Sequence, residues 1–146
     1  MADAARTVPA EPASADAKRL AACSERAFRS AMRFVRTNRR VNEIGRAVEV
    51  EVRRSGFRVI RELGGHGIGR TIHESPSVPN FDDRAASGRL TAGLVITVEP
   101  IIAMGSGRTR NADDGWTVKT ADGGLSAHFE HTLVIPGGAP ILLTAA

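Results

Sequence analysis

The sequence contains no tyrosine, one tryptophan and five phenylalanines, so aromatic residues make up only 4% of its 146 residues. A folded core must therefore be built mainly from aliphatic side chains. Its one cysteine, Cys23, cannot form an internal disulfide, which favours a cytoplasmic location. No stretch approaches the roughly 18 apolar residues that a membrane-spanning helix needs, and residues 1–18 lack the apolar centre of a secretory signal. We therefore expect a cytoplasmic protein with no membrane partner.

The composition that remains is typical of a globular chain, with 42% hydrophobic and 25% charged residues, and it excludes a wholly disordered or collagen-like protein. The charge is uneven. Residues 18–61 carry thirteen Lys or Arg against four Glu, a local net charge of +9, whereas residues 62–146 carry six basic and nine acidic residues, a net charge of −3. The basic segment either faces a polyanion such as ribosomal RNA or forms a solvated helix face. The lack of interleaved aromatic residues favours the solvated face.

The first half of the chain predicts a tail followed by two helices. Residues 1–18 are rich in alanine and contain two prolines without an apolar period, so we expect a disordered tail. Apolar residues recur at near-helical intervals over 19–36. A second helix is expected to begin at a cap on Asn42 and to end at Ser55-Gly56.

From residue 57 onward the pattern favours strands. A glycine cluster lies at 64–69, and Pro76 and Pro79 are typical of a loop. Short β-branched or apolar runs predict strands at 94–98, 101–102, 116–120, 128–135 and 141–143. Two helices followed by several strands indicate an α+β domain over 19–146, with both helices on one face of an antiparallel sheet.

Two acidic residues stand where a buried strand is expected. Glu99 follows the run 94–98, and Glu130 lies inside the run 128–135, where a charge costs several kcal/mol unless it is paired or bound to a metal. Together with His66 they could bind a divalent metal ion. Each residue taken alone is more often structural, so only their convergence supports the functional interpretation.

Other motifs are incomplete. Arg70 stands where the third glycine of a dinucleotide-binding fingerprint would be, and His73-Glu74 lacks the second histidine of a zincin helix. Ser126 has no nucleophile elbow around it.

Read together, four blocks of sequence closely resemble the signatures of the type I methionine aminopeptidases. The first runs from Gly65-His-Gly-Ile-Gly-Arg70 through His73-Glu74 to Asn80, and the second is Gly93-Leu-Val-Ile-Thr-Val-Glu99-Pro100-Ile-Ile102. The third is Asp114-Gly-Trp116-Thr-Val-Lys-Thr120, and the fourth is Leu125-Ser-Ala-His-Phe-Glu130-His131-Thr132. The resemblance covers about residues 19–146.

The resemblance implies a pita-bread fold, in which two similar α+β halves surround a two-metal site, and an enzyme that removes N-terminal methionine from nascent proteins with metal-activated water. By position, His66, Glu99 and Glu130 resemble metal ligands, with Glu130 shared between the ions. Glu99 would also move a proton, and His73 would contact the scissile peptide. Ile72 and Trp116 resemble walls of the methionine pocket. The implied cofactor is a divalent ion, Co, Mn, Fe or Zn.

The family takes two further aspartate ligands from its first half, and only the expected tail and helices precede the glycine cluster here. We therefore expect the second half of a pita-bread enzyme, with three of five ligands and at most one weakly bound ion. Implied partners are the nascent peptide and the ribosome, together with a second copy or a polypeptide that supplies the missing half. The alternative function is a non-catalytic module that binds peptides, the ribosome or another protein.

Overall fold

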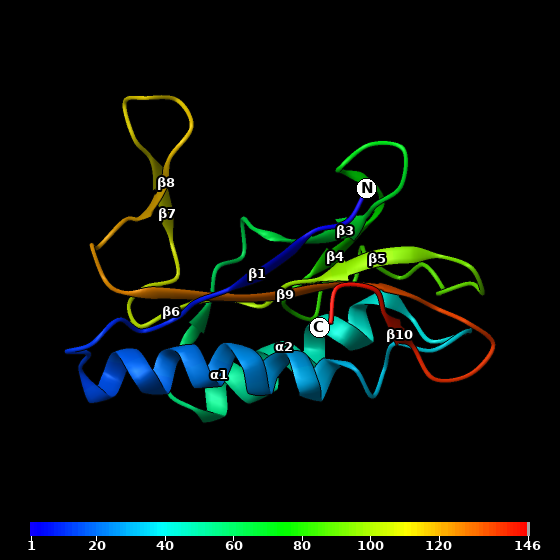
Figure 1. The fold of residues 1–146 in the computed structure, drawn as a ribbon, viewed down its shortest axis with the longest axis horizontal. Coiled ribbons are helices and arrows are strands. Elements are labelled where there is room, and N and C mark those ends of the chain that lie inside the picture. The colour runs from blue at the N-terminus through cyan, green and yellow to red at the C-terminus, as the bar shows by residue number, and fades with distance from the viewer. Residues whose placement is uncertain (146) are drawn as a thin grey trace.

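A computed structural model describes residues 1–145 and shows two helices lying against one face of an antiparallel sheet (Figure 1). The helices are α1 (Ala15–Ala31) and α2 (Val41–Arg54). The first strands are β1 (Ala4–Arg6), β2 (Arg58–Val59), β3 (Gly64–Gly67), β4 (Glu74–Pro79) and β5 (Val95–Val98). The remaining strands are β6 (Ile101–Ala103), β7 (Thr109–Asn111), β8 (Val118–Thr120), β9 (Ser126–Val134) and β10 (Ile141–Leu142).

Helix α1 is stabilised by packing on the sheet through a stripe of apolar and small residues. Ser14 caps its first turn, where the Ser14 hydroxyl accepts a hydrogen bond from the Ala17 amide at 3.1 Å. The buried positions follow helical spacing and comprise Leu20, Cys23, Ser24, Ala27, Phe28 and Ala31. The helix thus begins four residues earlier than the expected start at Arg19 and ends five residues before the expected end at Arg36.

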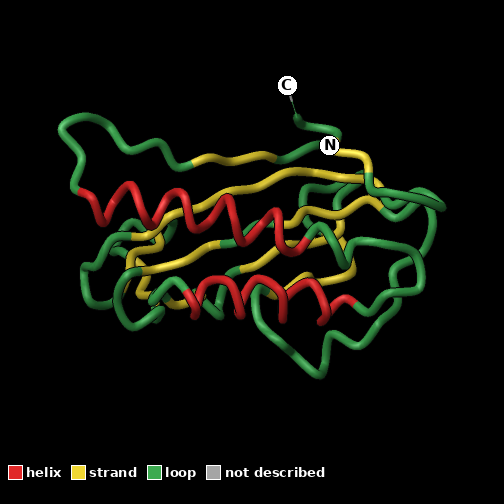
Figure 2. Tube along the Cα trace, turned by 90° about the horizontal axis from the view of Figure 1, so that it is seen from below, coloured by secondary structure: helices red, strands yellow, loops and turns green. Residues whose placement is uncertain are grey.

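Helix α2 packs unusually close to the loop that follows β4. It begins at Val41 rather than at a cap on Asn42, because the Glu43 carboxylate accepts a hydrogen bond from the Arg40 amide. Gly45 faces the loop, and a Cβ there would lie 2.2 Å from the Phe81 carbonyl oxygen. Glycine is therefore required at this position for the helix and the loop to touch. Figure 2, which views the molecule from below, shows the two helices side by side across one face of the strands.

Strand β9 is the centre of the sheet. The main strand order is β2-β6-β9-β5-β3-β4, and β1 and β10 also pair with β9. Individual residues of β9 pair with β5 on one edge and with β1 or β10 on the other. His131, for example, pairs with Val98 on one edge and with Ala4 on the other. A separate hairpin of β7 and β8 projects from the sheet on the side away from the helices (Figure 1).

The structure also differs from the sequence expectations at two places among the strands. Residues 4–6 of the expected disordered tail form β1, paired antiparallel with residues 129–131 of β9. The expected loop around Pro76 and Pro79 is strand β4, paired with the glycine-rich β3. Both errors arise because backbone pairing with a neighbouring strand outweighs local composition. Of the residues described, no helix is long and apolar enough to cross a membrane.

Candidate metal centre

Three strands bring the expected histidine and carboxylates together at the middle of the sheet. Glu130 lies halfway along β9, Glu99 at the break between β5 and β6, and His66 in β3. All three side chains are buried, with exposed fractions of 3%, 8% and 9% respectively. Residues far apart in the sequence thus converge, as expected for a site and not for isolated structural residues.

A fourth donor comes from the segment expected to be a disordered tail. Asp3 immediately precedes β1, and Asp3, His66 and Glu130 each offer one ligand atom within 4.8 Å of the others. The Asp3 backbone is fixed on β9 because its carbonyl accepts hydrogen bonds from the amide and the hydroxyl of Thr132. The expectation that no aspartate before the glycine cluster reaches the site is therefore wrong.

Little in the sequence indicates that Asp3 belongs to the site. The strand that positions it, Ala4-Ala-Arg6, is three residues long and has no apolar alternation, so its propensity predicts no strand. Thr7 fixes the far end of β1, because its hydroxyl accepts a hydrogen bond from the His128 amide. That bond depends on tertiary pairing and is invisible in the sequence.

The histidine is oriented as a metal ligand would be. His66 Nδ1 lies 2.9 Å from the Gly67 carbonyl oxygen, which can only accept, so Nδ1 carries the hydrogen and Nε2 has a free lone pair. Nε2 lies 3.5 Å from Glu99 Oε2. Glu99 Oε2 also accepts a hydrogen bond from the Thr97 hydroxyl at 2.7 Å, which fixes the carboxylate.

The carboxylates of the centre are buried close to one another, and both effects favour their protonated forms. Burial, followed by the charges of Glu99 and Asp3, raises the pKa of Glu130 from 4.5 to about 8. Burial also raises the pKa of Glu99. Glu130 Oε1 is buried without a hydrogen-bond partner in the described residues. An unpaired buried carboxylate oxygen beside two more carboxylates and a lone pair fits a cation.

The chemistry of these donors fits a divalent metal. One imidazole nitrogen and three carboxylates, without any thiolate, suit Mn²⁺, Fe²⁺, Co²⁺ or Zn²⁺. Asp3, His66 and Glu130 have ligand atoms close enough to hold one ion, and Glu99 lies beside them, 3.5 Å from His66 Nε2. Asp3 thus adds a fourth candidate donor to the three expected from the sequence.

His73 and Ile72 lie on the loop between β3 and β4, at the rim of the centre. The rings of His73 and His66 are edge to face with centroids 4.3 Å apart. Both His73 and Ile72 are exposed, Ile72 by 38%. His73 is therefore accessible to a bound peptide while it contacts a candidate ligand.

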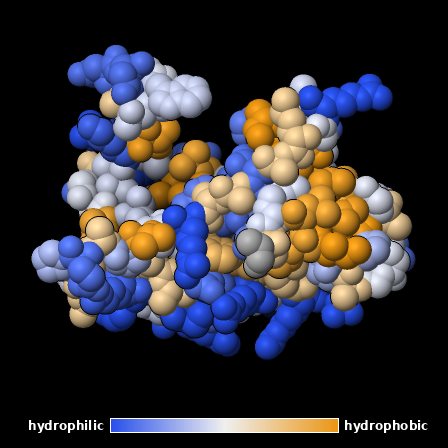
Figure 3. All heavy atoms as spheres, in the orientation of Figure 1, coloured by the Kyte–Doolittle hydropathy of each residue, from blue (hydrophilic) through white to orange (hydrophobic). Residues whose placement is uncertain are grey.

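Trp116 is not brought to the same point. It lies at the turn between β7 and β8 and is 90% exposed. The hairpin and the loop that carries Ile72 form two projections on the face of the molecule opposite the helices, with a recess between them (Figures 1 and 3). The segments that carry Trp116 and Ile72 thus lie on either side of an open recess, and residues 1–145 do not form a closed pocket between them.

His128 lies next to the centre on β9, and its imidazole tends to remain uncharged. Its Nε2 lies 3.5 Å from Glu130 Oε2 and has no hydrogen-bond partner in the part of the chain described. Burial lowers its pKa. The side chain therefore borders the carboxylates without supplying the positive charge that they lack.

Comparisons with known proteins agree with this geometry. The sequence model of metallopeptidase family M24 matches residues 1–136. A methionine aminopeptidase of Clostridium perfringens is 42% identical over 142 residues, which are 97% of this chain and 57% of the relative. One of Aquifex aeolicus is 40% identical over 97% of this chain and 56% of the relative.

Solved structures show the same fold. The methionine aminopeptidase of Thermotoga maritima superposes with a TM-score of 0.94 at 32% identity, over 99% of this chain and 58% of that one. A prolidase from Pyrococcus furiosus superposes with a TM-score of 0.77 at 20% identity and supports the fold alone. The fold is thus half of the pita-bread architecture, as expected, and the chain spans a little over half the length of these methionine aminopeptidases.

Proposed function

Because this chain belongs to metallopeptidase family M24, we propose that it forms the metal-binding half of an aminopeptidase that removes N-terminal methionine from peptides. The observation that carries the proposal is the convergence of Asp3, His66, Glu99 and Glu130 on one buried point. The methionine aminopeptidases that it resembles supply the substrate class.

A bound divalent ion supplies Lewis-acid chemistry, which acidifies water and polarises a peptide carbonyl. The candidate ligands of this chain form the site that would hold the ion. Glu130 and Glu99, whose pKa values are raised chiefly by burial, would lose their protons when they coordinate the ion. Because Thr97 binds Glu99 at Oε2, the Oε1 atom of Glu99 remains to accept and return a proton during hydrolysis.

The rim residues would orient the substrate. His73 is exposed next to His66 and can donate a hydrogen bond to the carbonyl oxygen of the scissile peptide. Ile72 and Trp116 offer apolar surface on either side of the recess for an unbranched side chain such as methionine. We propose that substrate narrows this recess or that a further polypeptide segment completes it.

We propose that the remaining half, whether in the same polypeptide or in another, docks on the free edge of β1. That strand pairs with β9 on one side, and its other backbone edge has no strand beside it among residues 1–145. A hollow of about 440 Å³ runs along this edge beside Phe129 and Glu130. An unpaired edge next to a hollow can accept another strand.

A second function, a non-catalytic peptide-binding module, is favoured by one observation. Trp116 is 90% exposed, so the residues described do not form a closed side-chain pocket. Such a module would bind a metal and a peptide without hydrolysis.

The test measures metal content and cleavage of a Met-Ala-Ser peptide on one sample. The chain is loaded with Mn²⁺ or Co²⁺ and assayed alone and with the first half of the Clostridium perfringens relative. We expect one ion per chain, and cleavage in the mixture that His73→Ala abolishes while metal content stays unchanged. Metal and peptide binding without cleavage in either sample supports the module instead, and no metal binding at all refutes both.

A further inference from the structure

Two buried threonines lie opposite each other next to the metal centre. Thr97 of β5 pairs with Thr132 of β9 across the sheet, and both side chains are completely buried. Glu130 lies two residues before Thr132 on β9, so both side chains point to the same face of the sheet. The intervening faces differ, because Phe129 points the other way and contacts Phe28 of α1, with ring centroids 5.2 Å apart. The threonine pair therefore lies on the face that carries the candidate ligands.

The Thr97 hydroxyl joins two of these candidate ligands. It accepts a hydrogen bond from the His66 amide at 3.0 Å and donates one to Glu99 Oε2 at 2.7 Å. Because the amide can only donate, the single hydrogen of the hydroxyl is available for the carboxylate. Removal of this one oxygen would leave the His66 amide and Glu99 Oε2 buried without these partners.

This contact takes over from backbone pairing at the point where β3 meets β5. The register pairing of the two strands is limited to Gly67 with Ile96. One residue away, the His66 amide binds the Thr97 side chain in place of a backbone carbonyl. The Thr97 carbonyl lies against Gly65 instead, where a Cβ would be 2.4 Å from its oxygen. The position of His66 relative to β5 thus depends on a side chain as well as on the sheet.

The Thr132 hydroxyl holds the segment that carries Asp3. It accepts a hydrogen bond from the Asp3 amide and donates one to the Asp3 carbonyl, both at 2.7 Å. The Thr132 amide also donates to the Asp3 carbonyl, at 3.1 Å. Since Asp3 immediately precedes β1, these bonds extend the pairing of β1 with β9 to the candidate ligand itself.

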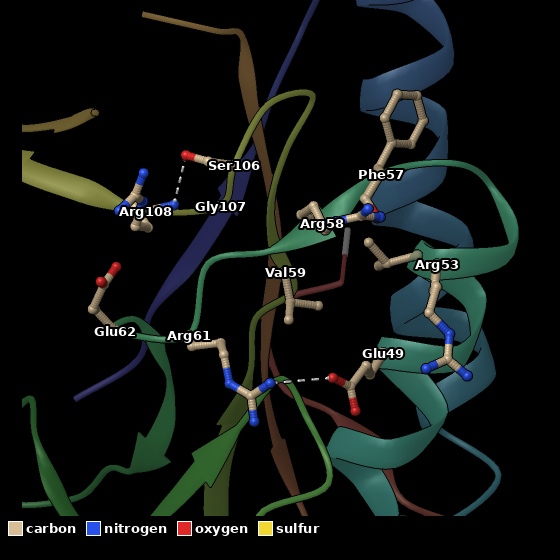
Figure 4. A pocket seen from close by; sticks show the side chains of 11 residues that line it. Glu49, Arg53, Phe57, Arg58, Val59, Arg61, Glu62, Ser106, Gly107 and Arg108 are labelled. Carbon is tan, nitrogen blue, oxygen red and sulfur yellow. Dashed lines mark hydrogen bonds and ion pairs between the residues drawn. The ribbon is translucent and has the colours of Figure 1, made fainter. Parts of the chain in front are cut away.

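A hydroxyl–carboxylate bond of the same kind occurs away from the centre. The Thr109 hydroxyl of β7 donates to Glu62 Oε2 at 2.9 Å, and Glu62 lies at the wall of the hollow shown in Figure 4. Glu62 is exposed and belongs to no candidate metal group among residues 1–145. This bond therefore offers a matched comparison for the bond between Thr97 and Glu99.

We propose that Thr97 and Thr132 are positioning residues that hold three of the four candidate donors in the arrangement a divalent ion requires. Thr97 fixes His66 and Glu99, and Thr132 fixes Asp3. The pair has this role only if these donors bind the ion, so the inference rests on the proposed function. Groups that hydrogen-bond to metal ligands commonly contribute roughly 10- to 100-fold to metal affinity, because they orient the ligands before the ion binds.

The test measures the Mn²⁺ affinity of the full chain and its variants by calorimetry. Thr97→Val removes the hydroxyl and keeps the branched shape of the side chain, so affinity should fall roughly 10- to 100-fold. Thr97→Ser keeps the hydroxyl and should stay within about threefold of the wild type. Thr132→Val should weaken binding less than Thr97→Val does, because its hydroxyl holds the backbone of Asp3 and not the carboxylate.

The visible absorption of bound Co²⁺ gives a second readout, which a loss of stability alone would not move. Its bands depend on the number and geometry of the ligands. Thr97→Val should shift these bands, and Thr97→Ser should restore them. In an Asp3→Asn background, Thr132→Val should lose most of its effect on affinity, whereas Thr97→Val should keep its effect.

Thr109→Val is the matched control and should leave both the affinity and the Co²⁺ bands unchanged. Melting temperatures of the metal-free variants show whether they are folded. If Thr97→Val does not fold, Thr132→Val tests the same pair from the other strand.

The possible failures are distinguishable. Wild-type affinity in both valine variants of the pair overturns this inference and leaves the proposed function standing. A loss in Thr97→Ser or in Thr109→Val as large as in Thr97→Val also overturns it, because the hydroxyl at the centre would then have no special role. No ion bound by the wild type overturns the proposed function together with this inference.

Discussion

Glu130 should make the metal-free protein less stable as pH rises, and Glu130→Gln should remove that dependence. The pKa of Glu130 is raised from 4.5 to about 8 in the folded chain, chiefly by burial. Between these two values the folded state holds a proton that the unfolded state has lost. The stability associated with that proton is complete below about pH 4.5 and disappears as pH rises through 8.

The size of the effect follows from proton linkage. One proton of difference costs about 1.4 kcal/mol per pH unit, which sets an upper limit of roughly 3 kcal/mol between pH 5.5 and 7.5. Because Glu99 shares the same charge repulsion, we expect about 1–2 kcal/mol from Glu130. For a chain of this size that corresponds to a fall in melting temperature of roughly 2–8 °C.

The assay is thermal unfolding of chelator-treated protein from pH 5.5 to 7.5. The amide introduced by Glu130→Gln has no proton to lose, so the difference between variant and wild type should grow in favour of the variant as pH rises. Asp113→Asn, at an exposed carboxylate, is the control and should run parallel to the wild type. Parallel curves for Glu130→Gln and wild type would refute the reasoning.

Metal should reverse the sign of the Glu130→Gln effect. At pH 7.5 added Mn²⁺ should raise the melting temperature of the wild type and leave the variant unchanged, because a ligand that binds only the folded state stabilises it. Binding should also release protons near pH 7, since the carboxyl must ionise to coordinate. Calorimetry in two buffers of different ionisation enthalpy measures that release.

Four further outcomes follow from named contacts. His66→Ala should abolish metal binding, whereas His73→Ala should keep the metal and lose cleavage, as elemental analysis and peptide assay will show. Asp3→Asn should weaken Mn²⁺ binding, measured by calorimetry, by more than about 10-fold. Replacing a residue that only hydrogen-bonds to a metal ligand already costs about that much. Unchanged affinity would exclude Asp3 as a ligand. Gly45→Ala should lower the free energy of unfolding by about 1–3 kcal/mol in urea, because steric overlap with backbone outweighs a gain of about 1 kcal/mol in helix propensity. Gly88→Ala, whose Cβ would meet open space, should change it little.

The two helices, and the candidate ligands that lie after residue 57, could be predicted from the sequence because their signals are local. The stripe of α2 repeats Ile44, Val48 and Val52 at four-residue spacing, and all three are buried. Glu99 and Glu130 stood out because a charge inside an apolar run requires a partner.

The rest of the site depends on pairing between distant segments. Strand β3 is a glycine cluster whose close packing needs the missing side chain, since a Cβ on Gly65 would lie 2.4 Å from the Thr97 carbonyl oxygen. Strand β1 has no propensity of its own, and only its register with Glu130 gives Asp3 a role. Local composition therefore predicted a tail where the fold places a candidate ligand.

That register has a consequence for folding. Asp3 and Glu130 lie near opposite termini, so an ion held by both acts as a cross-link that closes a loop of more than a hundred residues. A cross-link that closes so long a loop lowers the conformational entropy of the unfolded chain, and it stabilises the pairing of the short β1 with β9. Chelation should accordingly speed amide exchange at Ala5 and Thr7, whose amides face β9, far more than in the middle of α2, so that the first residues report on whether the cation is bound.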